Sequence, residues 1–326
     1  MCYTLFMINT KINFLPQIQD KLIEIGELLG RIKQLPSYKP TPNLRKESKI
    51  RTVFATTKIE GNELTYDEVT AIIDGKRIKG KKKDVLEVKN TLKLYDMISN
   101  LDPSSEMDFL LGHNVLMKGL IDNYGKYRDV NVGIKSNGKI KITFPEHKKI
   151  IKLCSDMFDY ICNSTDNYII KSCLVHYLAI SIHPFEDGNG RISRFWQSLF
   201  LSKNHEIFEF LPIESLIKSN QKDYYEYLYL AQKSDEPTGF VDFMLKILIK
   251  SLKEGLKYPF ESGESKQDLR LRLASEEFGD KEFTRKDYLD IHIGISPSLA
   301  SKDLASFVNS GVINKRGMAN GTRYFF

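Results

Sequence analysis

Residues 183–194 bring together the side-chain types that phosphate chemistry requires. The segment reads His-Pro-Phe-Glu-Asp-Gly-Asn-Gly-Arg-Ile-Ser-Arg. Gly188 and Gly190 allow a tight turn whose backbone N–H groups converge on an anion at the start of a helix. Arg191 and Arg194 are three residues apart on that helix, so they lie on neighbouring positions of one face, where two guanidinium groups hold phosphate oxygens. The pattern predicts a phosphate-binding loop and helix.

Two further residues of this segment are suited to a reaction at a bound phosphate. His183 precedes a proline that ends the foregoing helix, so we expect its imidazole at the helix mouth as a titratable base. The Asp187 carboxylate is a hard oxygen ligand of the kind that a phosphate-bound Mg²⁺ prefers. The residue types therefore predict His183 as a general base and Asp187 as a metal ligand.

Helices are expected on both sides of this loop and through most of the chain. The apolar residues 173–182 predict a buried helix directly before it. Residues 15–100 carry apolar side chains at three- and four-residue spacings, which indicate a helical N-terminal region. Within that region, a helix over residues 50–60 ends at Gly61, and Thr65 starts the next helix with a capping box.

Residues 130–144 differ from the helical segments around them. Apolar residues alternate with polar ones on both sides of Asn137 and Gly138, a dipeptide that favours a tight two-residue turn. The pattern predicts a β-hairpin inside an otherwise helical block.

The C-terminal part changes in character after a polar segment. Residues 258–267 contain Pro and Gly and are interpreted as a linker. Helices are then expected over 269–278, over 285–291 and from Ser296 to Gly311, followed by strands over 312–315 and 322–326. Three helices followed by two short strands are typical of a winged helix-turn-helix.

The composition is that of a globular protein. The 326 residues are 41% hydrophobic and 28% charged. No uncharged apolar stretch approaches the roughly 20 residues that span a bilayer, and the first residues lack the features of a signal peptide. Four cysteines without a CxxC pair predict neither a disulfide scaffold nor a zinc site, so a cytoplasmic protein is expected. The net charge of +6 permits a phosphate-bearing partner without requiring one.

The chain resembles the Fic-domain family. Residues 183–194 match the pattern His-x-Phe-x-Asp/Glu-Gly-Asn-Gly-Arg-x-x-Arg at every fixed position, and the resemblance extends over about residues 104–255. His113 and the turn ending at Arg128 also fall where the family has such features. Fic proteins are mostly helical enzymes that transfer AMP from ATP to a protein hydroxyl and release pyrophosphate. The resemblance implies a mostly α fold with three domains: a helical N-terminal region, residues 1–103; a Fic core with a β-hairpin flap, 104–257; and a winged helix, 266–326.

The resemblance also implies roles for residues already singled out. His183 would take the proton from a Ser, Thr or Tyr hydroxyl as its oxygen attacks the α-phosphate of ATP, and Asp187 would hold Mg²⁺. The nucleotide would be bound by the loop and first turns of the helix, that is by Asp187, Gly188, Asn189, Gly190, Arg191, Ile192, Ser193 and Arg194.

The hairpin and a tyrosine pair would complete the substrate site. The hairpin, residues 130–144, corresponds to the family's flap, on which the target protein docks by strand addition. Its predicted nucleotide contacts are Ile134, Lys135 and Ser136, although the lysine-bearing flap departs from the commoner glycine-rich form and suggests an acidic or otherwise different target. Tyr224 and Tyr225 would flank the adenine or ribose, with an ordinary core position as the alternative.

A second motif resembles the family's built-in inhibitor. Residues 56–62 read Thr-Thr-Lys-Ile-Glu-Gly-Asn and match Ser/Thr-x-x-x-Glu-Gly/Asn, at the end of a helix over about residues 50–61. The resemblance implies that Glu60 pairs with Arg194 and so occupies the guanidinium that the γ-phosphate needs. Some members use the equivalent glutamate to remove AMP, so Glu60 is a candidate brake, deAMPylation base, or both.

Alternatives to AMP transfer remain open. The winged helix, with Lys302, Lys315, Arg316 and Arg323, would suit a DNA-binding regulator whose Fic core senses nucleotide, although nearby acidic residues weaken that reading. Transfer of a different phosphate-containing group is the rival within the family. The expected partners are ATP and a hydroxyl-bearing protein, with self-modification, a homodimer and DNA as further options and no membrane.

Overall fold

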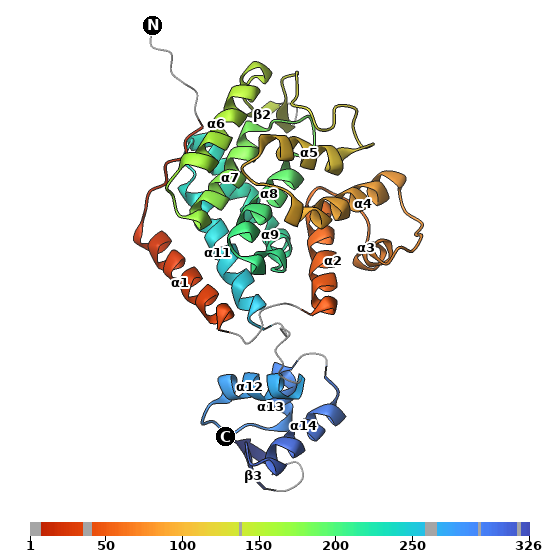
Figure 1. Ribbon diagram of the computed structural model, residues 1–326, viewed down its shortest axis with the longest axis vertical. Coiled ribbons are helices and arrows are strands. Elements are labelled where there is room, and N and C mark those ends of the chain that lie inside the picture. The colour runs from red at the N-terminus through yellow and green to blue at the C-terminus, as the bar shows by residue number, and fades with distance from the viewer. Residues whose placement is uncertain (1–7, 35–40, 137–138, 258–265, 293–294, 318–320) are drawn as a thin grey trace. The chain divides into compact units, whose positions relative to one another are not determined.

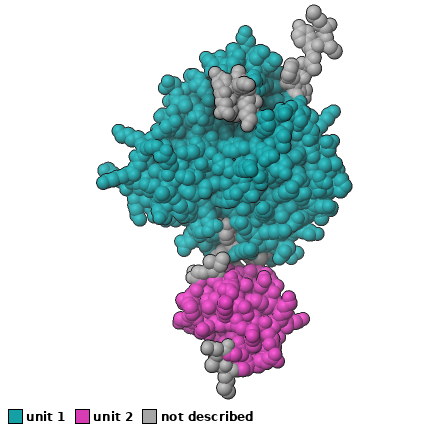
Figure 2. All heavy atoms as spheres, turned by 180° about the vertical axis from the view of Figure 1, so that it is seen from behind, with its two compact units in different colours: residues 1–34, 40–258 teal, residues 35–39, 259–326 magenta. Residues whose placement is uncertain are grey.

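The computed structural model describes residues 8–34, 41–136, 139–257, 266–292, 295–317 and 321–326. Helices predominate, which confirms the predicted mostly α class. The chain forms two compact units, one comprising residues 1–34 and 40–258 and the other residues 35–39 and 259–326 (Figure 2). The finer division of the first unit into an N-terminal region and a core stays a prediction.

Helix α7 (Tyr168–Ile182), which Figure 1 shows in green near the centre of the first unit, packs against three other helices of that unit. The other α-helices are α1 (Pro16–Lys33), α2 (Pro42–Ile59), α3 (Tyr66–Ile73), α4 (Lys82–Asp96), α5 (Glu106–Met117), α6 (Ile150–Asn163), α8 (Asn189–Asn204), α9 (Ile213–Ser219), α10 (Gln221–Ser234) and α11 (Thr238–Gly255). Short 3-10 helices are η1 (Ile98–Asn100), η2 (His147–Lys149) and η3 (Glu206–Glu209). Among the helices of the described ranges, none combines the length and the apolar character that crossing a bilayer requires.

Helix α7 is buried on every side. All of its residues from 169 to 182 are buried, because the sequence is apolar around the whole helix rather than along one stripe. Its lysine, Lys171, is tolerated because its ammonium group donates to the backbone oxygens of Ile161 and Ser164, at 3.2 and 2.7 Å. Helices α6, α8 and α11 pack against α7. The end of α7 is therefore a rigid place from which to present a side chain.

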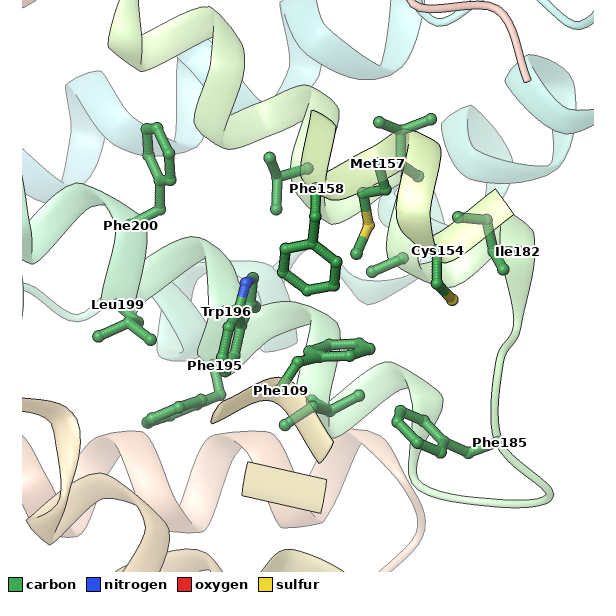
Figure 3. Packing of buried hydrophobic residues seen from close by; sticks show 14 of the residues in the cluster. Phe109, Cys154, Met157, Phe158, Ile182, Phe185, Phe195, Trp196, Leu199 and Phe200 are labelled. Carbon is green, nitrogen blue, oxygen red and sulfur yellow. The ribbon is translucent and has the colours of Figure 1, made fainter. Parts of the chain in front are cut away.

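An aromatic cluster fixes α8 against α5 and α6 (Figure 3). The ring of Phe109 lies edge-on to Trp196, with centroids 4.9 Å apart, and contacts Phe158 at 5.7 Å. The Trp196 indole N–H donates to the backbone oxygen of Pro103 at 3.0 Å, so its polar group is satisfied. These contacts hold α8, and with it the predicted phosphate loop, in one position.

Helix α2 brings the second motif beside α8. It begins after Thr41, whose side chain accepts a hydrogen bond from the Leu44 backbone N–H, and is longer than the predicted helix over 50–60. It ends at Ile59, and the chain turns away at Gly61, where φ is 89°, a value that favours glycine. The predicted capping box of α3 is confirmed at Thr65 and Glu68. Helices α3, α4, α8 and α9 all contact α2.

Two short strands pair where the hairpin is predicted. β1 (Gly133–Ser136) and β2 (Lys139–Thr143) are antiparallel, with Ile134 opposite Ile142 and an irregularity after Ile134. The predicted tip, residues 137–138, and the side chains of residues 134–142, which include the predicted contacts Ile134, Lys135 and Ser136, lie outside the described residues.

The second unit contains three helices followed by two strands. They are α12 (Lys266–Phe278), α13 (Arg285–Ile291), α14 (Pro297–Asn309), β3 (Asn314–Arg316) and β4 (Arg323–Phe325). The two strands are antiparallel, and a small core that includes Phe283, Tyr288 and Leu304 lies beneath them and the helices. Helix α12 begins inside the predicted linker, whose residues 258–265 lie outside the described ones. The order of three helices and two strands is the order predicted from the sequence. The winged-helix assignment stays a prediction.

Candidate catalytic and phosphate-binding site

The predicted loop lies between the end of α7 and the start of α8. Helix α7 ends at Ile182, as the proline after His183 predicts, and His183 adopts φ 52° and ψ 58°, a left-handed conformation that is uncommon for a residue with a side chain. The Asn189 side chain holds the loop closed, because its amide oxygen accepts from the Phe185 N–H at 2.9 Å and its amide nitrogen donates to the Phe185 oxygen at 2.8 Å. The loop shape is therefore set by hydrogen bonds within the segment.

His113 on α5 contacts the loop through its ring and through a hydrogen bond. Its ring stacks on Phe185, with centroids 3.6 Å apart, and Nε2 lies 2.9 Å from the Asp187 carbonyl oxygen. Nδ1 accepts from the Gly125 N–H at 3.0 Å, so the proton of the neutral ring is on Nε2 and is donated to Asp187. Burial lowers the pKa of His113 to about 4, which keeps this arrangement neutral at physiological pH.

The first turn of α8 is open to an anion. No side chain caps this terminus; its N-cap is Gly188, with φ 82°. A Cβ at Gly188 would lie 2.7 Å from the Met117 sulfur, so both the conformation and the space require glycine. The N–H groups of the first turn have no intrahelical partner and point out of the helix beside the Asp187 carboxylate.

Three residues predicted to contact the nucleotide have other contacts. The Asn189 side chain is occupied by Phe185, so its backbone N–H is what remains for a phosphate. Ile192 is fully buried in the core beside Gly112. The buried Ser193 hydroxyl donates to the Asn189 oxygen at 2.6 Å. The side chains of Ile192 and Ser193 face the interior of the helix bundle, because positions 192 and 193 lie on the opposite side of α8 from its arginine face. A nucleotide contact of these two residues stays a prediction.

His183 is oriented as a base. Its ring stacks on Phe144, with centroids 3.8 Å apart, and Nδ1 lies 3.4 Å from the Ile180 carbonyl oxygen. Because a carbonyl only accepts hydrogen bonds, Nδ1 carries the proton and Nε2 keeps a free lone pair. Burial lowers the pKa of His183 to about 4, and the charge of Arg128 acts in the same direction. The imidazole is therefore neutral and able to accept a proton near pH 7.

Arg128 ties His183 to both ends of the hairpin. Its guanidinium donates to the backbone oxygens of His183 at 2.8 Å, Val130 at 2.7 Å and Pro145 at 2.5 Å. Its backbone N–H donates to the Pro184 oxygen at 2.9 Å. One buried side chain thus fixes the hairpin relative to the base.

Asp187 meets the requirements for a Mg²⁺ ligand. Its side chain is 50% exposed, and Oδ1 accepts from the Gly188 N–H at 2.6 Å and from Arg191 at 3.1 Å. Among the described residues, no group of three or more His, Cys, Asp or Glu is arranged to hold a metal ion. A single accessible carboxylate beside an anion site suits an ion that is held mainly by substrate phosphates, as Mg²⁺ in nucleotide sites is. The donor set therefore fits the predicted metal.

The two arginines of α8 are buried and paired. Arg191 donates to Glu87 on α4 at 2.5 Å, and Arg194 donates to Glu60 at 2.7 Å. Arg194 also donates to the Thr56 hydroxyl at 2.9 Å and to the Thr56 backbone oxygen at 3.1 Å. Burial by itself lowers the pKa of Arg194, but the charge and hydrogen bond of Glu60 outweigh it and the pKa is raised.

Each arginine keeps one buried nitrogen without a hydrogen-bond partner in the part of the chain that the structure describes. These atoms are Arg191 Nε and Arg194 Nη1. A buried donor that is left unpaired is costly, and a phosphate oxygen would satisfy it. The unpaired donors, the open helix terminus and the neighbouring carboxylate all favour a polyphosphate ligand.

The Glu60 carboxylate lies over the first turn of α8. A Cβ at Gly190 would be 2.5 Å from Glu60 Oε1 and 3.2 Å from Arg194 Nη1. The glycine therefore allows the carboxylate, or a phosphate in its place, to approach the backbone closely. The Glu60 side chain is 24% exposed and that of Arg194 is 1% exposed, so the pair is largely shielded from water.

A cavity of about 360 Å³ brings the predicted base, the two predicted partners Glu60 and Arg194, and an exposed tyrosine together. Its walls include Glu60, Phe144, His183, Gly190, Arg194 and Tyr225. It shares Phe144, Tyr229 and Gln232 with a neighbouring cavity of about 680 Å³. Volumes of this size accommodate a nucleotide or part of one.

The structure separates the two tyrosines that the sequence pairs. Tyr225 is 44% exposed and lines the cavity, as predicted for a nucleotide contact. Tyr224 is fully buried, and its hydroxyl lies 2.9 Å from Nε2 of the buried His176. Its ring therefore occupies the core position that the sequence left open as the alternative, while a role beside the nucleotide stays a prediction. Adjacent residues of a helix point about 100° apart, so the two rings face different surroundings.

Comparison with known proteins agrees with this geometry. The Fic/DOC family model matches residues 103–201. A solved structure of a Fic family protein from Desulfovibrio desulfuricans G20 is 32% identical, covers 96% of this chain and 97% of its own, and superposes with a TM-score of 0.72. The chain belongs to the Fic/DOC family.

Curated relatives of this Fic protein are more distant. They include protein adenylyltransferase fic-1 of Caenorhabditis briggsae, 26% identical over 67% of this chain and 44% of the relative, and protein adenylyltransferase Fic of Nematostella vectensis, 28% identical over 67% and 51%. The chain thus spans about half the length of these relatives.

Several site residues of this Fic protein were not found from the sequence. Glu87 is 104 residues from its partner Arg191, and Thr56 is 138 residues from Arg194. Glu87 belongs to no spacing pattern, and only the packing of helices far apart in the sequence brings it to Arg191. Thr56 begins the motif that ends at Glu60 and Gly61, but the motif does not show that its side chain contacts Arg194. The resemblance to the family singled out His113 and Arg128 without giving either residue a role. The hydrogen bonds show that His113 contacts the loop at Asp187 and that Arg128 contacts His183.

Proposed function

We propose that this protein is an adenylyltransferase that moves AMP from ATP to a Ser, Thr or Tyr hydroxyl of a target protein and releases pyrophosphate. The observation that carries the proposal is that a neutral His183, Arg194 and Gly190 in the uncapped first turn of α8 line one cavity. The names of the curated relatives support the same reaction.

The geometry supports a direct transfer. His183 Nε2 accepts the proton of the target hydroxyl as the hydroxyl oxygen bonds to the α-phosphorus. The bond between the α-phosphorus and the bridging oxygen breaks, and pyrophosphate leaves. The first-turn N–H groups of α8, Arg191 and Arg194 orient the phosphates and stabilise the charge on the leaving group. Mg²⁺ held by Asp187 and the phosphates would neutralise further negative charge.

Glu60 would act as an inhibitor of this reaction. Its carboxylate takes the Arg194 donor and the space above Gly190 that a γ-phosphate would need. ATP would then bind weakly or in a pose that does not react. We also propose a second activity of the same site, in which this carboxylate activates a water molecule for removal of AMP; the cavity that it shares with His183 supports this.

The target protein would dock at the hairpin. Arg128 fixes both ends of the hairpin relative to His183, so a segment that pairs with a hairpin strand would present its hydroxyl at the base. The larger cavity, whose walls include Thr143, Pro145, Glu146 and Lys149, adjoins this region and could receive a target side chain.

The second unit is proposed to be a winged helix that serves as an accessory module. The order of three helices and two antiparallel strands supports the assignment. A DNA-binding regulator is the alternative function. It is less well supported, because Arg316, one of the four predicted phosphate contacts, is held by Glu282 at 2.8 Å.

Transfer from α-labelled ATP tests the proposal. We expect little labelling by the wild type, strong labelling by Glu60→Gly and none by Glu60→Gly with His183→Ala. Glu63→Gly is the matched control, because Glu63 is an exposed glutamate in the same turn that pairs with Lys81, and it should behave as the wild type. A folded Glu60→Gly variant that binds ATP with Mg²⁺ but transfers no label would contradict the proposed reaction.

A further inference from the structure

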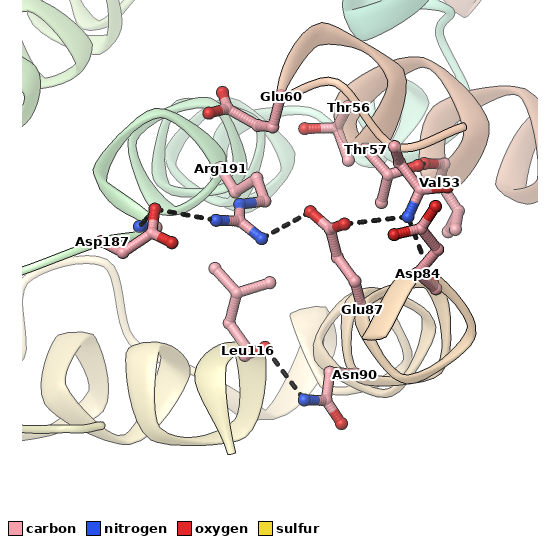
Figure 4. Close-up of polar contacts among 12 residues, drawn as sticks. Val53, Thr56, Thr57, Glu60, Asp84, Glu87, Asn90, Leu116, Asp187 and Arg191 are labelled. Carbon is pink, nitrogen blue, oxygen red and sulfur yellow. Dashed lines mark hydrogen bonds and ion pairs between the residues drawn. The ribbon is translucent and has the colours of Figure 1, made fainter. Parts of the chain in front are cut away.

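Glu87 is a buried carboxylate that contacts the phosphate site from α4. One oxygen, Oε1, accepts from Arg191 Nη1 at 2.5 Å, and the other, Oε2, accepts from the Asn62 side-chain amide at 2.8 Å. Its side chain is 9% exposed. Figure 4 shows Arg191 lying between Glu87 on one side and Asp187 on the other. Glu87 lies outside the motifs that define the site, whereas Asn62 is the last residue of the segment 56–62.

Arg191 is thus shared by two carboxylates of different character. Its side chain is 6% exposed, and its Nη2 donates to Asp187 at 3.1 Å. Asp187 is half exposed and is the residue proposed to hold Mg²⁺, whereas Glu87 is enclosed by α2, α4 and α8. A metal ion and a guanidinium compete for the same carboxylate oxygens.

A buried guanidinium needs a counter-charge in every state of the site. If Asp187 were the only partner of Arg191, giving that carboxylate to a metal ion would leave a buried cation unpaired beside a second cation, which is strongly unfavourable. Glu87 removes this conflict, because it stays paired with Arg191 when Asp187 turns to the metal. Arg191 Nη2 and the unpaired Nε are then free to meet phosphate oxygens.

We propose that Glu87 is a positioning residue that holds Arg191 and its charge in place, so that Asp187 can bind Mg²⁺ with the nucleotide. The inference rests on the proposed function, since it concerns the nucleotide and metal of that reaction.

Asn62 connects Glu87 to the inhibitory turn. The Asn62 backbone N–H donates to the Thr57 oxygen at 3.1 Å and closes the end of α2 around Gly61. This closure directs Glu60, on one side of Gly61, to Arg194, and the Asn62 side chain, on the other side, to Glu87. A second bond from the Asn62 amide to the Asp84 oxygen, at 3.1 Å, fixes its orientation. One turn therefore supports both arginines of α8.

Calorimetric titration of ATP, with and without Mg²⁺, tests the role of Glu87. All variants carry Glu60→Gly, so that the inhibitor is removed, and Glu87→Gln is compared with the control Glu63→Gln. In Glu87→Gln, Arg191 keeps Asp187 as its one charged partner and competes with the metal. We expect ATP affinity in Mg²⁺ to fall about tenfold or more, as it does when an outer partner of a metal ligand is lost. Affinity for ATP without metal should not weaken, and Glu63→Gln should match its parent in both titrations.

Equal weakening with and without Mg²⁺ would show a general structural role and overturn the proposal, as would no change in either titration. If Glu87→Gln does not fold, Asn62→Ala is the variant that tests the proposal, since it removes a hydrogen bond to Glu87 without removing the charge of Glu87. We expect a smaller loss of ATP affinity than for Glu87→Gln, again confined to the titration with Mg²⁺. A parent variant that binds ATP with Mg²⁺ but transfers no AMP would overturn the proposed function alone. A folded parent that binds no ATP with Mg²⁺ would overturn both.

Discussion

Removing the Glu60 carboxylate should raise kcat/KM for AMP transfer. The strength of the contact between Glu60 and Arg194 should set the size of the increase. Glu60 makes one charge-assisted hydrogen bond to Arg194, at 2.7 Å, in a largely shielded position. Such bonds contribute about 1.5–3 kcal/mol, and neutral ones about 0.5–1.5 kcal/mol. A free-energy difference of about 2.7 kcal/mol between the inhibited and the active site corresponds to a change of roughly 100-fold in an equilibrium constant. We therefore expect Glu60→Gly to raise kcat/KM for AMP transfer roughly 100-fold, and Glu60→Gln, which keeps the shape but loses the charge, to raise it roughly tenfold.

The rate of transfer from α-labelled ATP at saturating Mg²⁺ measures both variants against the wild type. The order matters more than the absolute values, because the Gln side chain can still donate and accept within the same space. An increase of less than roughly tenfold for Glu60→Gly would mean that the Arg194 pair is not what restrains the reaction. A larger increase for Glu60→Gln than for Glu60→Gly would refute the electrostatic reasoning, since the neutral side chain still fills the position of the phosphate.

Two substitutions and one titration test the loop and the base. Gly188→Ala forces a side chain into a left-handed conformation and against the Met117 sulfur, so we expect it to lower the free energy of unfolding by about 1–3 kcal/mol in a denaturant titration; an unchanged midpoint would contradict this. Asn189→Ala leaves the buried N–H and carbonyl of Phe185 unpaired and should cost about 1–3 kcal/mol by the same measurement, more than an exposed Asn→Ala change elsewhere. The His183 imidazole should titrate with a pKa of about 4 in an NMR experiment. Because the unfolded chain binds that proton at an ordinary pKa near 6.5, stability should fall as the pH drops from about 6.5 toward 4, and a midpoint near 6.5 in the folded protein would contradict the buried position.

The sequence predicted the parts of the site that are local in the chain. The end of α7 at His183, the loop and the start of α8 follow from a proline, two glycines and an apolar run within one segment. The capping box of α3 and the end of α2 before Gly61 likewise follow from short-range hydrogen bonds. In each case the residues that decide the structure are within about one helical turn of it.

What the sequence could not predict depends on contacts between distant elements. Glu87 reads as one more charged residue on a lysine-rich helix, and only the packing of α2, α4 and α8 shows that it is buried against Arg191. For Tyr224 and Tyr225 the sequence left two positions open for a related reason: their adjacency says nothing about which of the two rings faces the core. Ile192 and Ser193 belong to the motif by spacing, yet their side chains serve packing.

The intact mass of the purified protein after incubation with ATP and Mg²⁺ tests the central claim most directly, because mass distinguishes AMP from any other transferred group. The account predicts that Glu60→Gly gains the mass of one or more AMP groups, that the wild type gains little, and that adding His183→Ala abolishes the gain. A folded Glu60→Gly protein that stays unmodified, or that gains a phosphate or another group in place of AMP, would contradict it.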